Sequence, residues 1–159
     1  MNPKILFAVT TLILLIGGVR CEKEKINTIQ LRDFSYTGCK GNSDMTKQSV
    51  SEAIFKDQEY IEYMAIEDGY LHIKHINAQF NCCPDTIMVN FSVDNNSVVI
   101  TEDEQIPKCN CFCDYDLEYN IGPLSSKKYT ILIYKGNLEQ TKFNIKYNSS
   151  IKGKITIKK

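Results

Sequence analysis

The fold is decided by residues 109–134, which read CNCFCDYDLEYNIGPLSSKKYTILIY. From Tyr115 to Ile121, apolar or aromatic residues alternate with acidic or amide residues. Alternate residues of an extended strand share a face, so this pattern indicates a β-strand with one face in a core. The predicted core face consists of Tyr115, Leu117, Tyr119 and Ile121. The rest of the chain is expected to pack around this strand.

The C-x-C-x-C run lies directly before this strand and continues its alternation. The same parity puts Cys109, Cys111 and Cys113 on the inward face, at one end of the core. Phe112 then points outward and becomes a candidate contact point for a partner. A β-bulge in the strand would instead turn Phe112 inward.

Short strand patterns recur along the remaining sequence. Asp68-Gly69 lies between two β-rich runs and supplies the positive φ of a hairpin turn. Near the C-terminus, Phe143, Ile145 and Tyr147 alternate with polar residues. Roughly eight or nine short strands are separated by turn signals, and no long helical period competes with them. The sequence therefore predicts an all-β, antiparallel β-sandwich, formed by one disulfide-stapled domain at residues 29–159.

The segment after the central strand resembles one corner of a known architecture. Leu124 precedes Tyr129 by five residues, and Ile131 and Ile133 follow in a strand pattern. This arrangement is similar to the tyrosine corner of fibronectin type III and immunoglobulin-like sandwiches, in which a Tyr hydroxyl bonds to upstream backbone. The chain has no Trp, and position 131 is not Cys, so the resemblance is to the architecture rather than to a true immunoglobulin domain.

The N-terminus has the pattern of an export signal. A short positive segment precedes an apolar run from Ile5 to Ile16, which is too short for a comfortable membrane span. Cys21 follows, and a cysteine there is typical of a bacterial lipoprotein signal that is cleaved before the lipid-modified cysteine. We therefore expect a signal peptide at residues 1–20 and a tether at residues 21–28. Arg20 stands where such signals carry a small residue, so ordinary secretion, with cleavage between Gly18 and Cys21, is the alternative.

Six cysteines remain after Cys21, and behind an export signal they indicate disulfides. Six cysteines allow fifteen pairings, and the sequence does not choose among them. Cys82 and Cys83 are adjacent, and a bond between them would strain the peptide, so we expect each to pair with the 109–113 run or with Cys39. The predicted disulfide residues are Cys39, Cys82, Cys83, Cys109, Cys111 and Cys113.

A thiolate metal site is the alternative use of these cysteines. Cys82, Cys83, Cys109, Cys111 and Cys113 would supply five soft ligands for Zn²⁺ or Cu⁺. Zinc sites favour two to four residues between paired cysteines, and an oxidising compartment works against free thiols. We therefore expect no metal and no cofactor in the primary interpretation.

The charged residues carry no signature of a specific chemistry. The chain has 19 basic and 19 acidic residues without a basic stripe, which argues against a nucleic-acid partner. His72 and His75 lie three apart on a predicted strand, so they point to opposite faces and are interpreted as surface or rim residues. The run from Glu102 to Glu104 is interpreted as a turn. An outward carboxylate row is interpreted as a solvated face, with Ca²⁺ binding as the alternative; it consists of Asp114, Asp116 and Glu118.

Three segments together resemble small secreted lipoproteins of the Bacteroidetes: Cys21–Glu24, Phe80–Pro84 and Cys109–Leu117. The resemblance implies an envelope lipoprotein with a β-sandwich and brings no known activity. No nucleophile–base pair, carboxylate pocket or phosphate loop is evident, so we expect no enzymatic activity. The sequence predicts a non-catalytic binding or structural module of the cell envelope, tethered by its N-terminal lipid to the outer membrane, with an unidentified protein or glycan ligand.

Overall fold

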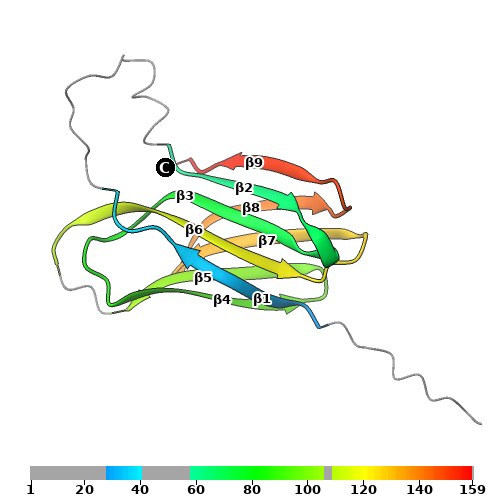
Figure 1. Cartoon of the computed structure of the whole chain (residues 1–159), viewed down its shortest axis with the longest axis horizontal. Helices are drawn as coiled ribbons and strands as arrows, with labels where there is room; N and C mark the ends of the chain where they lie inside the picture. Colours follow the sequence, from blue (N-terminus) through cyan, green and yellow to red (C-terminus); the bar gives the residue numbers. More distant parts are fainter. Residues whose placement is uncertain (1–27, 41–57, 106–108, 159) are drawn as a thin grey trace, which may run out of the picture.

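The computed structural model describes residues 28–40, 58–105 and 109–158, and its strands form two packed β-sheets (Figure 1). The larger sheet contains, in spatial order, β1 (Gln30–Tyr36), β6 (Phe112–Gly122), β3 (Leu71–Asn81), β2 (Tyr60–Ala65) and β9 (Lys152–Thr156). The smaller sheet contains β4 (Thr86–Asp94), β5 (Ser97–Gln105), β7 (Lys128–Lys135) and β8 (Leu138–Lys146). The prediction of an all-β sandwich is confirmed.

The predicted signal peptide, Cys21 and nearly all of the tether lie outside the described residues. Within the described part of the chain, no helix is long and apolar enough to cross a membrane. The first described residue is Thr28, and β1 begins two residues later. The cellular location of the protein and the lipid on Cys21 therefore remain predictions from the sequence.

The larger sheet is antiparallel throughout, but the smaller sheet contains one parallel pair, β5 with β7. The chain leaves β5 for β6 in the opposite sheet and then returns as β7. The direction reverses at each of these two crossings, so β5 and β7 run the same way. The expectation of an entirely antiparallel sandwich is therefore wrong for this pair, because hydrophobic alternation indicates which face of a strand is buried and not which strand lies beside it.

The core lies between the sheets, and the inward face of β6 is its centre. Tyr115, Leu117, Tyr119 and Ile121 are at most 3% exposed, which confirms the predicted core face. Burial of one such Leu or Ile side chain stabilises the fold by about 1.5–3 kcal/mol. The inward parity does not extend through the whole cysteine run, because β6 begins at Phe112 and Cys111 is exposed.

The hairpin between β2 and β3 is also confirmed, with a wider turn than a two-residue loop. Residues Glu67–Gly69 form a short 3₁₀ turn, in which Asp68 has φ 59° and Gly69 has φ 79°. Gly69 accepts a backbone hydrogen bond of 2.7 Å from the N–H of Leu124. This contact joins the β2–β3 turn to the crossing between β6 and β7, at the end of the sandwich opposite the cysteines.

Candidate functional site

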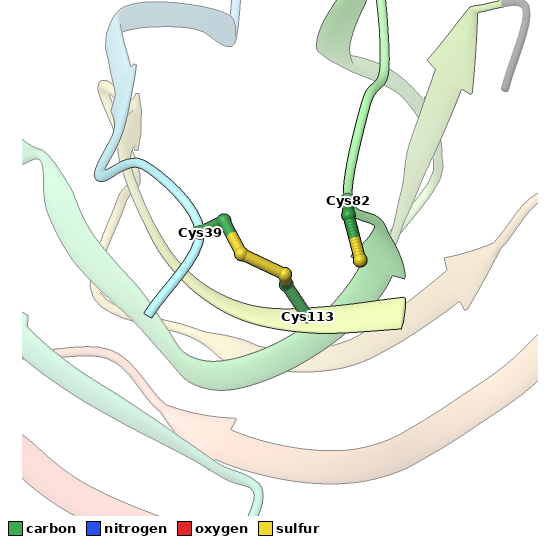
Figure 2. A group of neighbouring side chains, drawn as sticks. All are labelled: Cys39, Cys82 and Cys113. Carbon is green, nitrogen blue, oxygen red and sulfur yellow. A yellow bond between two sulfur atoms is a disulfide. The ribbon is translucent and has the colours of Figure 1, made fainter. Parts of the chain in front are cut away.

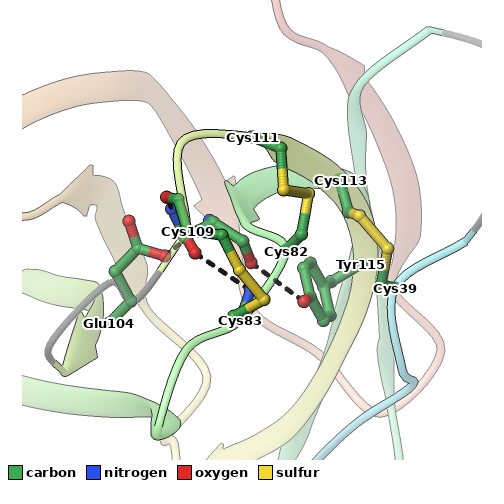
Figure 3. The surroundings of a disulfide bond; sticks show 9 residues. Cys39, Cys82, Cys83, Glu104, Cys109, Cys111, Cys113 and Tyr115 are labelled. Atoms are coloured by element: carbon green, nitrogen blue, oxygen red, sulfur yellow. Dashed lines mark hydrogen bonds between the residues drawn. A yellow bond between two sulfur atoms is a disulfide. The ribbon is translucent and has the colours of Figure 1, made fainter.

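One end of the sandwich is closed by three disulfides, and we call it the clamped end. The bridges join Cys39 to Cys113, Cys82 to Cys111 and Cys83 to Cys109, with Cα–Cα distances of 5.3, 5.6 and 5.7 Å. These distances lie within the usual range for disulfides. Figure 3 shows the three bridges side by side where β3 ends and β6 begins. The predicted disulfides are confirmed, and the adjacent pair Cys82 and Cys83 is not bonded to itself.

The clamp fixes the two places at this end where the chain changes sheets. Residues 82–85 carry the chain from β3 to β4, and Cys109 and Cys111 lie just before β6, after the chain has left β5. Two bridges tie these crossings together, with sequence separations of 29 and 26 residues. In the chain-entropy model, closing one loop of that length contributes about 3.5 kcal/mol, and the second bridge adds less because it closes nearly the same loop. The third bridge attaches Cys39, just beyond β1, to Cys113 in β6.

Asn81 organises the polar groups beneath the clamp. Its backbone N–H donates to Glu104 at 2.6 Å, and its carbonyl accepts from the Tyr115 hydroxyl at 2.9 Å. Its side chain donates to the carbonyl of Cys109 and accepts from the N–H of Cys83. Burial, and then the nearby Glu104 carboxylate, raises the pKa of Tyr115, which keeps its hydroxyl protonated. Asn81, itself 3% exposed, thus joins β3, β5 and β6 inside the clamp.

The clamp also brings three sulfur atoms together. Those of Cys39, Cys82 and Cys113 lie within 4.8 Å of one another, and Figure 2 shows Cys82 beside the Cys39–Cys113 bridge. All three sulfurs belong to disulfides, and a soft metal ion is held by thiolates. The donor set therefore suits a metal only after two bridges are reduced. Thiolate metal binding stays a prediction that requires a different redox state.

Phe112 stands on the clamped end between two bridged cysteines. Its side chain is 63% exposed, so it points outward, as one of the two sequence alternatives expected. The Lys135 ammonium lies 5.9 Å from the Phe112 ring centroid and 4.7 Å from that of Phe80. An exposed aromatic ring loses little conformational entropy when a partner covers it, so such rings often anchor interfaces. The clamp holds this ring on a fixed platform.

A second group of functional side chains is buried between the sheets, and we call it the His75 cluster. His75 Nδ1 lies 2.6 Å from Glu102 Oε2, and its Nε2 lies 3.0 Å from Glu59 Oε1. The Tyr119 hydroxyl donates to the other oxygen of Glu102 at 2.8 Å. His75 is 1%, Glu102 0% and Glu59 6% exposed. Side chains from both sheets therefore meet in a closed acid–base network.

The electrostatics of this cluster favour a protonated imidazole. Burial alone would lower the pKa of His75, but the carboxylates of Glu102 and Glu59 raise it from 6.5 to about 9. An imidazolium can donate from both nitrogens, which matches an acceptor on either side of the ring. Burial, and then Glu102, holds the pKa of Tyr119 well above its usual value. At neutral pH the His75 imidazole is therefore protonated inside the core, where a substrate cannot contact it.

The sequence interpretation of these residues was wrong in two respects. His75 is a core residue rather than a surface or rim residue, although His72 and His75 do point to opposite faces. Residues 102–104 belong to β5 and do not form a turn. A signal was present, because Glu102 continues the inward parity of Val98 and Ile100. The charge of Glu102 concealed that parity, since carboxylates are rarely buried without a partner.

Two of the three outward carboxylates of β6 form ion pairs with neighbouring lysines. Lys40 Nζ lies 2.5 Å from Asp116, and Lys74 Nζ lies 2.7 Å from Glu118. The backbone of Asp114 accepts a hydrogen bond from the N–H of Lys40 at 2.9 Å. These pairs support the interpretation of this row as a solvated face with ion pairs.

Tyr129 is buried at the end of the sandwich opposite the clamp. Its hydroxyl accepts a hydrogen bond of 3.1 Å from the N–H of Ser125, four residues upstream, and lies 3.3 Å from the Ser125 hydroxyl. The bond ties the start of β7 to the preceding loop. Tyr129 is thus a structural residue at a crossing between sheets.

Comparison with protein-family models, with curated proteins and with solved structures found no match. Two features stand out among the described residues: an exposed aromatic ring on a disulfide-fixed platform, and an acid–base cluster that is closed to solvent.

Proposed function

We propose that the chain is a non-catalytic module of the cell envelope, held to a membrane through lipid on Cys21, that binds a partner or serves a structural role. The three-disulfide clamp is the observation that carries this proposal. Disulfides persist in oxidising compartments outside the cytosol, so the clamp supports an extracytoplasmic location. The apolar segment and Cys21 of the sequence support the lipid tether.

The fold gives such a tether a direction. β1 begins at Gln30, which pairs with Gly122 at the end of β6, whereas Cys113 lies near the start of β6. Nine residues of extended strand separate these positions, a distance of about 30 Å. Figure 1 shows β1 beginning at the end of the sandwich away from the clamped end. An N-terminal anchor would therefore leave the clamp and Phe112 on the side facing away from the membrane.

The His75 cluster supports a non-catalytic role. Histidine, carboxylate and tyrosine side chains are the usual acids and bases of catalysis, but they must reach the substrate. Here the imidazole is 1% exposed and both of its nitrogens are engaged by carboxylates. The cluster has the geometry of a structural network between two sheets.

The intact mass of the protein isolated from the envelope tests this proposal. Thiol alkylation before reduction should add nothing, and alkylation after reduction should add six groups. An acyl mass on the mature N-terminus, lost in a Cys21→Ser variant, would establish the tether. The variant is a matched control because Cys21 lies outside the three bridges. Several free thiols together with bound Zn or Cu would overturn the proposal in favour of the thiolate metal site.

A further inference from the structure

A second candidate surface lies on the smaller sheet, at the end opposite the clamp. Its centre is a depression of about 480 Å³ on the outer face of β7 and β8. The β4–β5 turn borders it, since the carbonyl of Asn96 accepts the N–H of Thr130 at 2.9 Å. Five polar side chains line the depression: Asn96, Lys128, Thr130, Asn144 and Lys146. We call this surface the lysine depression.

Two lysines face each other across the lysine depression. The register of β7 and β8 places Lys128 directly opposite Lys146. Like charges directly opposite on neighbouring strands destabilise a sheet. The repulsion between the two ammonium groups therefore destabilises the free protein, and an anion bound between them would remove this repulsion.

The charges of these lysines are not balanced by the described part of the protein. Other strand lysines lie beside carboxylates, as Lys74 does with Glu118 and Lys154 with Glu62. Neither Lys128 nor Lys146 has a carboxylate oxygen within 4 Å among the described residues, and none of the residues lining the depression is acidic. The chain as a whole has equal numbers of acidic and basic residues, so this local excess is a property of the site.

Beside the two lysines, on the same outer face, lies a pair of neutral hydrogen-bonding groups. Thr130 and Asn144 also pair across β7 and β8, and the Thr130 hydroxyl donates to the Asn144 side-chain oxygen at 2.8 Å. This bond fixes the amide and directs its N–H groups away from Thr130. Amide and hydroxyl groups beside two cations match a ligand that carries hydroxyls next to an anionic group.

We propose that the lysine depression binds an acidic saccharide through a sugar carboxylate or sulfate held between Lys128 and Lys146. Thr130, Asn144 and Asn96 would hydrogen-bond the ring hydroxyls. A volume of about 480 Å³ is within the range of small-molecule sites and suits one or two sugar rings. The inference deepens the proposed function, on which it rests, by giving the envelope module a ligand class.

Nucleic acid and anionic membranes fit this surface less well. Tracking a phosphate backbone requires a stripe of cations, and only two lysines line the depression. The same end of the sandwich also carries the acidic side chains of Glu67 and Asp68, in the turn before β3, and of Asp94, the last residue of β4. A flat anionic surface would meet those carboxylates as well, whereas a single saccharide would meet only the depression.

Titration of the soluble domain with defined oligosaccharides, followed by backbone amide NMR shifts, tests the proposal. The probes are tetragalacturonate, an alginate tetramer and a chondroitin sulfate tetrasaccharide, with methyl-esterified tetragalacturonate as the neutral control. At least one acidic probe should shift the amides of Lys128, Thr130, Asn144 and Lys146, and the ester should not. Substituting both Lys128→Gln and Lys146→Gln should weaken binding at least tenfold. Raised salt should weaken it as well.

A matched double variant separates the site from general charge. Lys152→Gln with Lys158→Gln removes the same two charges from exposed positions at β9 and the C-terminus, and it should leave binding within twofold. Equal loss in both double variants, equal binding of the ester, or no shift with any acidic probe would overturn the proposal. Binding to phosphatidylglycerol vesicles without binding to any saccharide would also overturn it. The mass experiment on Cys21 is independent, so failure of the tether and failure of this site are distinguishable.

Discussion

The clamped end and the His75 cluster join the same strands by opposite means. The clamp connects the end of β3 to the start of β6 with covalent bonds. The cluster connects the middle of β3, β5 and β6 through one imidazole, two carboxylates and a hydroxyl. Disulfides respond to reductant and are indifferent to pH, whereas a shared proton responds to pH and is indifferent to reductant. Each region can therefore be perturbed while the other stays intact.

The clamped end and the His75 cluster also differ in their exposure to solvent, and therefore in whether a partner can contact them. The clamp lies at the surface and presents Phe112, so its rigidity is available to a partner. The His75 cluster presents no group to a partner, because its residues are at most 6% exposed to solvent. A buried charge network is costly to dehydrate and is kept together only by good geometry. We interpret the cluster as a lock on the register of the two sheets and the clamp as a platform.

The largest expected effect is that of reducing all three bridges. In the chain-entropy model, Cys39–Cys113 and one of the two nested bridges contribute roughly 4.5 and 3.5 kcal/mol, whereas a domain has only about 5–15 kcal/mol of stability in total. The reduced domain should therefore lose its cooperative unfolding transition in urea. A Cys82→Ser, Cys111→Ser double variant should keep the transition and lose only about 2 kcal/mol, because Cys83–Cys109 still closes nearly the same loop. A reduced protein as stable as the oxidised one would show that the His75 cluster and the hydrophobic core stabilise the fold without the disulfides.

The next effect is that of removing one carboxylate from the cluster. Glu102→Gln keeps the shape of the side chain and removes the charge that His75 and Tyr119 both contact. Breaking a buried charged pair costs about 3–5 kcal/mol, so the variant should be destabilised by about that amount in urea unfolding. The pKa of His75, followed by NMR, should also fall. Glu118→Gln on the outer face is the control, and an equal effect of the two substitutions would contradict a special role for the buried cluster.

The clamped end was much easier to predict from the sequence than the His75 cluster. Cysteine spacing and export context indicate disulfides directly, and the strand parity of Tyr115 to Ile121 placed the core face correctly. Pairing within the sheets was not predictable, because alternation does not name a neighbour. His75 and Glu102 were missed because each looks like a surface residue until its partner is known. Only the folded chain brings together two residues that lie 27 positions apart.

The pH dependence of stability tests the proton held by the cluster. The pKa of His75 is about 9 in the folded protein and 6.5 as the ordinary value, so the folded state binds the proton more tightly. The contribution is fully present below pH 6.5 and is lost as the pH rises towards 9. Unfolding free energy should fall by roughly 3 kcal/mol across this window, measured in urea at fixed salt. His75→Gln should flatten the profile there, and an unchanged slope in that variant would assign the proton to another group.

The smallest effect is expected one residue away, on the opposite face of the same strand. Lys74 pairs with Glu118 at 2.7 Å, and both side chains are 37% exposed. Water therefore screens this ion pair, whereas it does not reach the buried ion pairs of the neighbouring His75. Exposed pairs contribute about 0.2–1 kcal/mol, so Lys74→Gln should cost less than 1 kcal/mol in urea unfolding, and 1 M salt should erase the difference. A cost as large as that of Glu102→Gln would mean that burial does not separate the two faces of β3. The inner cluster would then be one ion pair among several rather than the lock between the sheets.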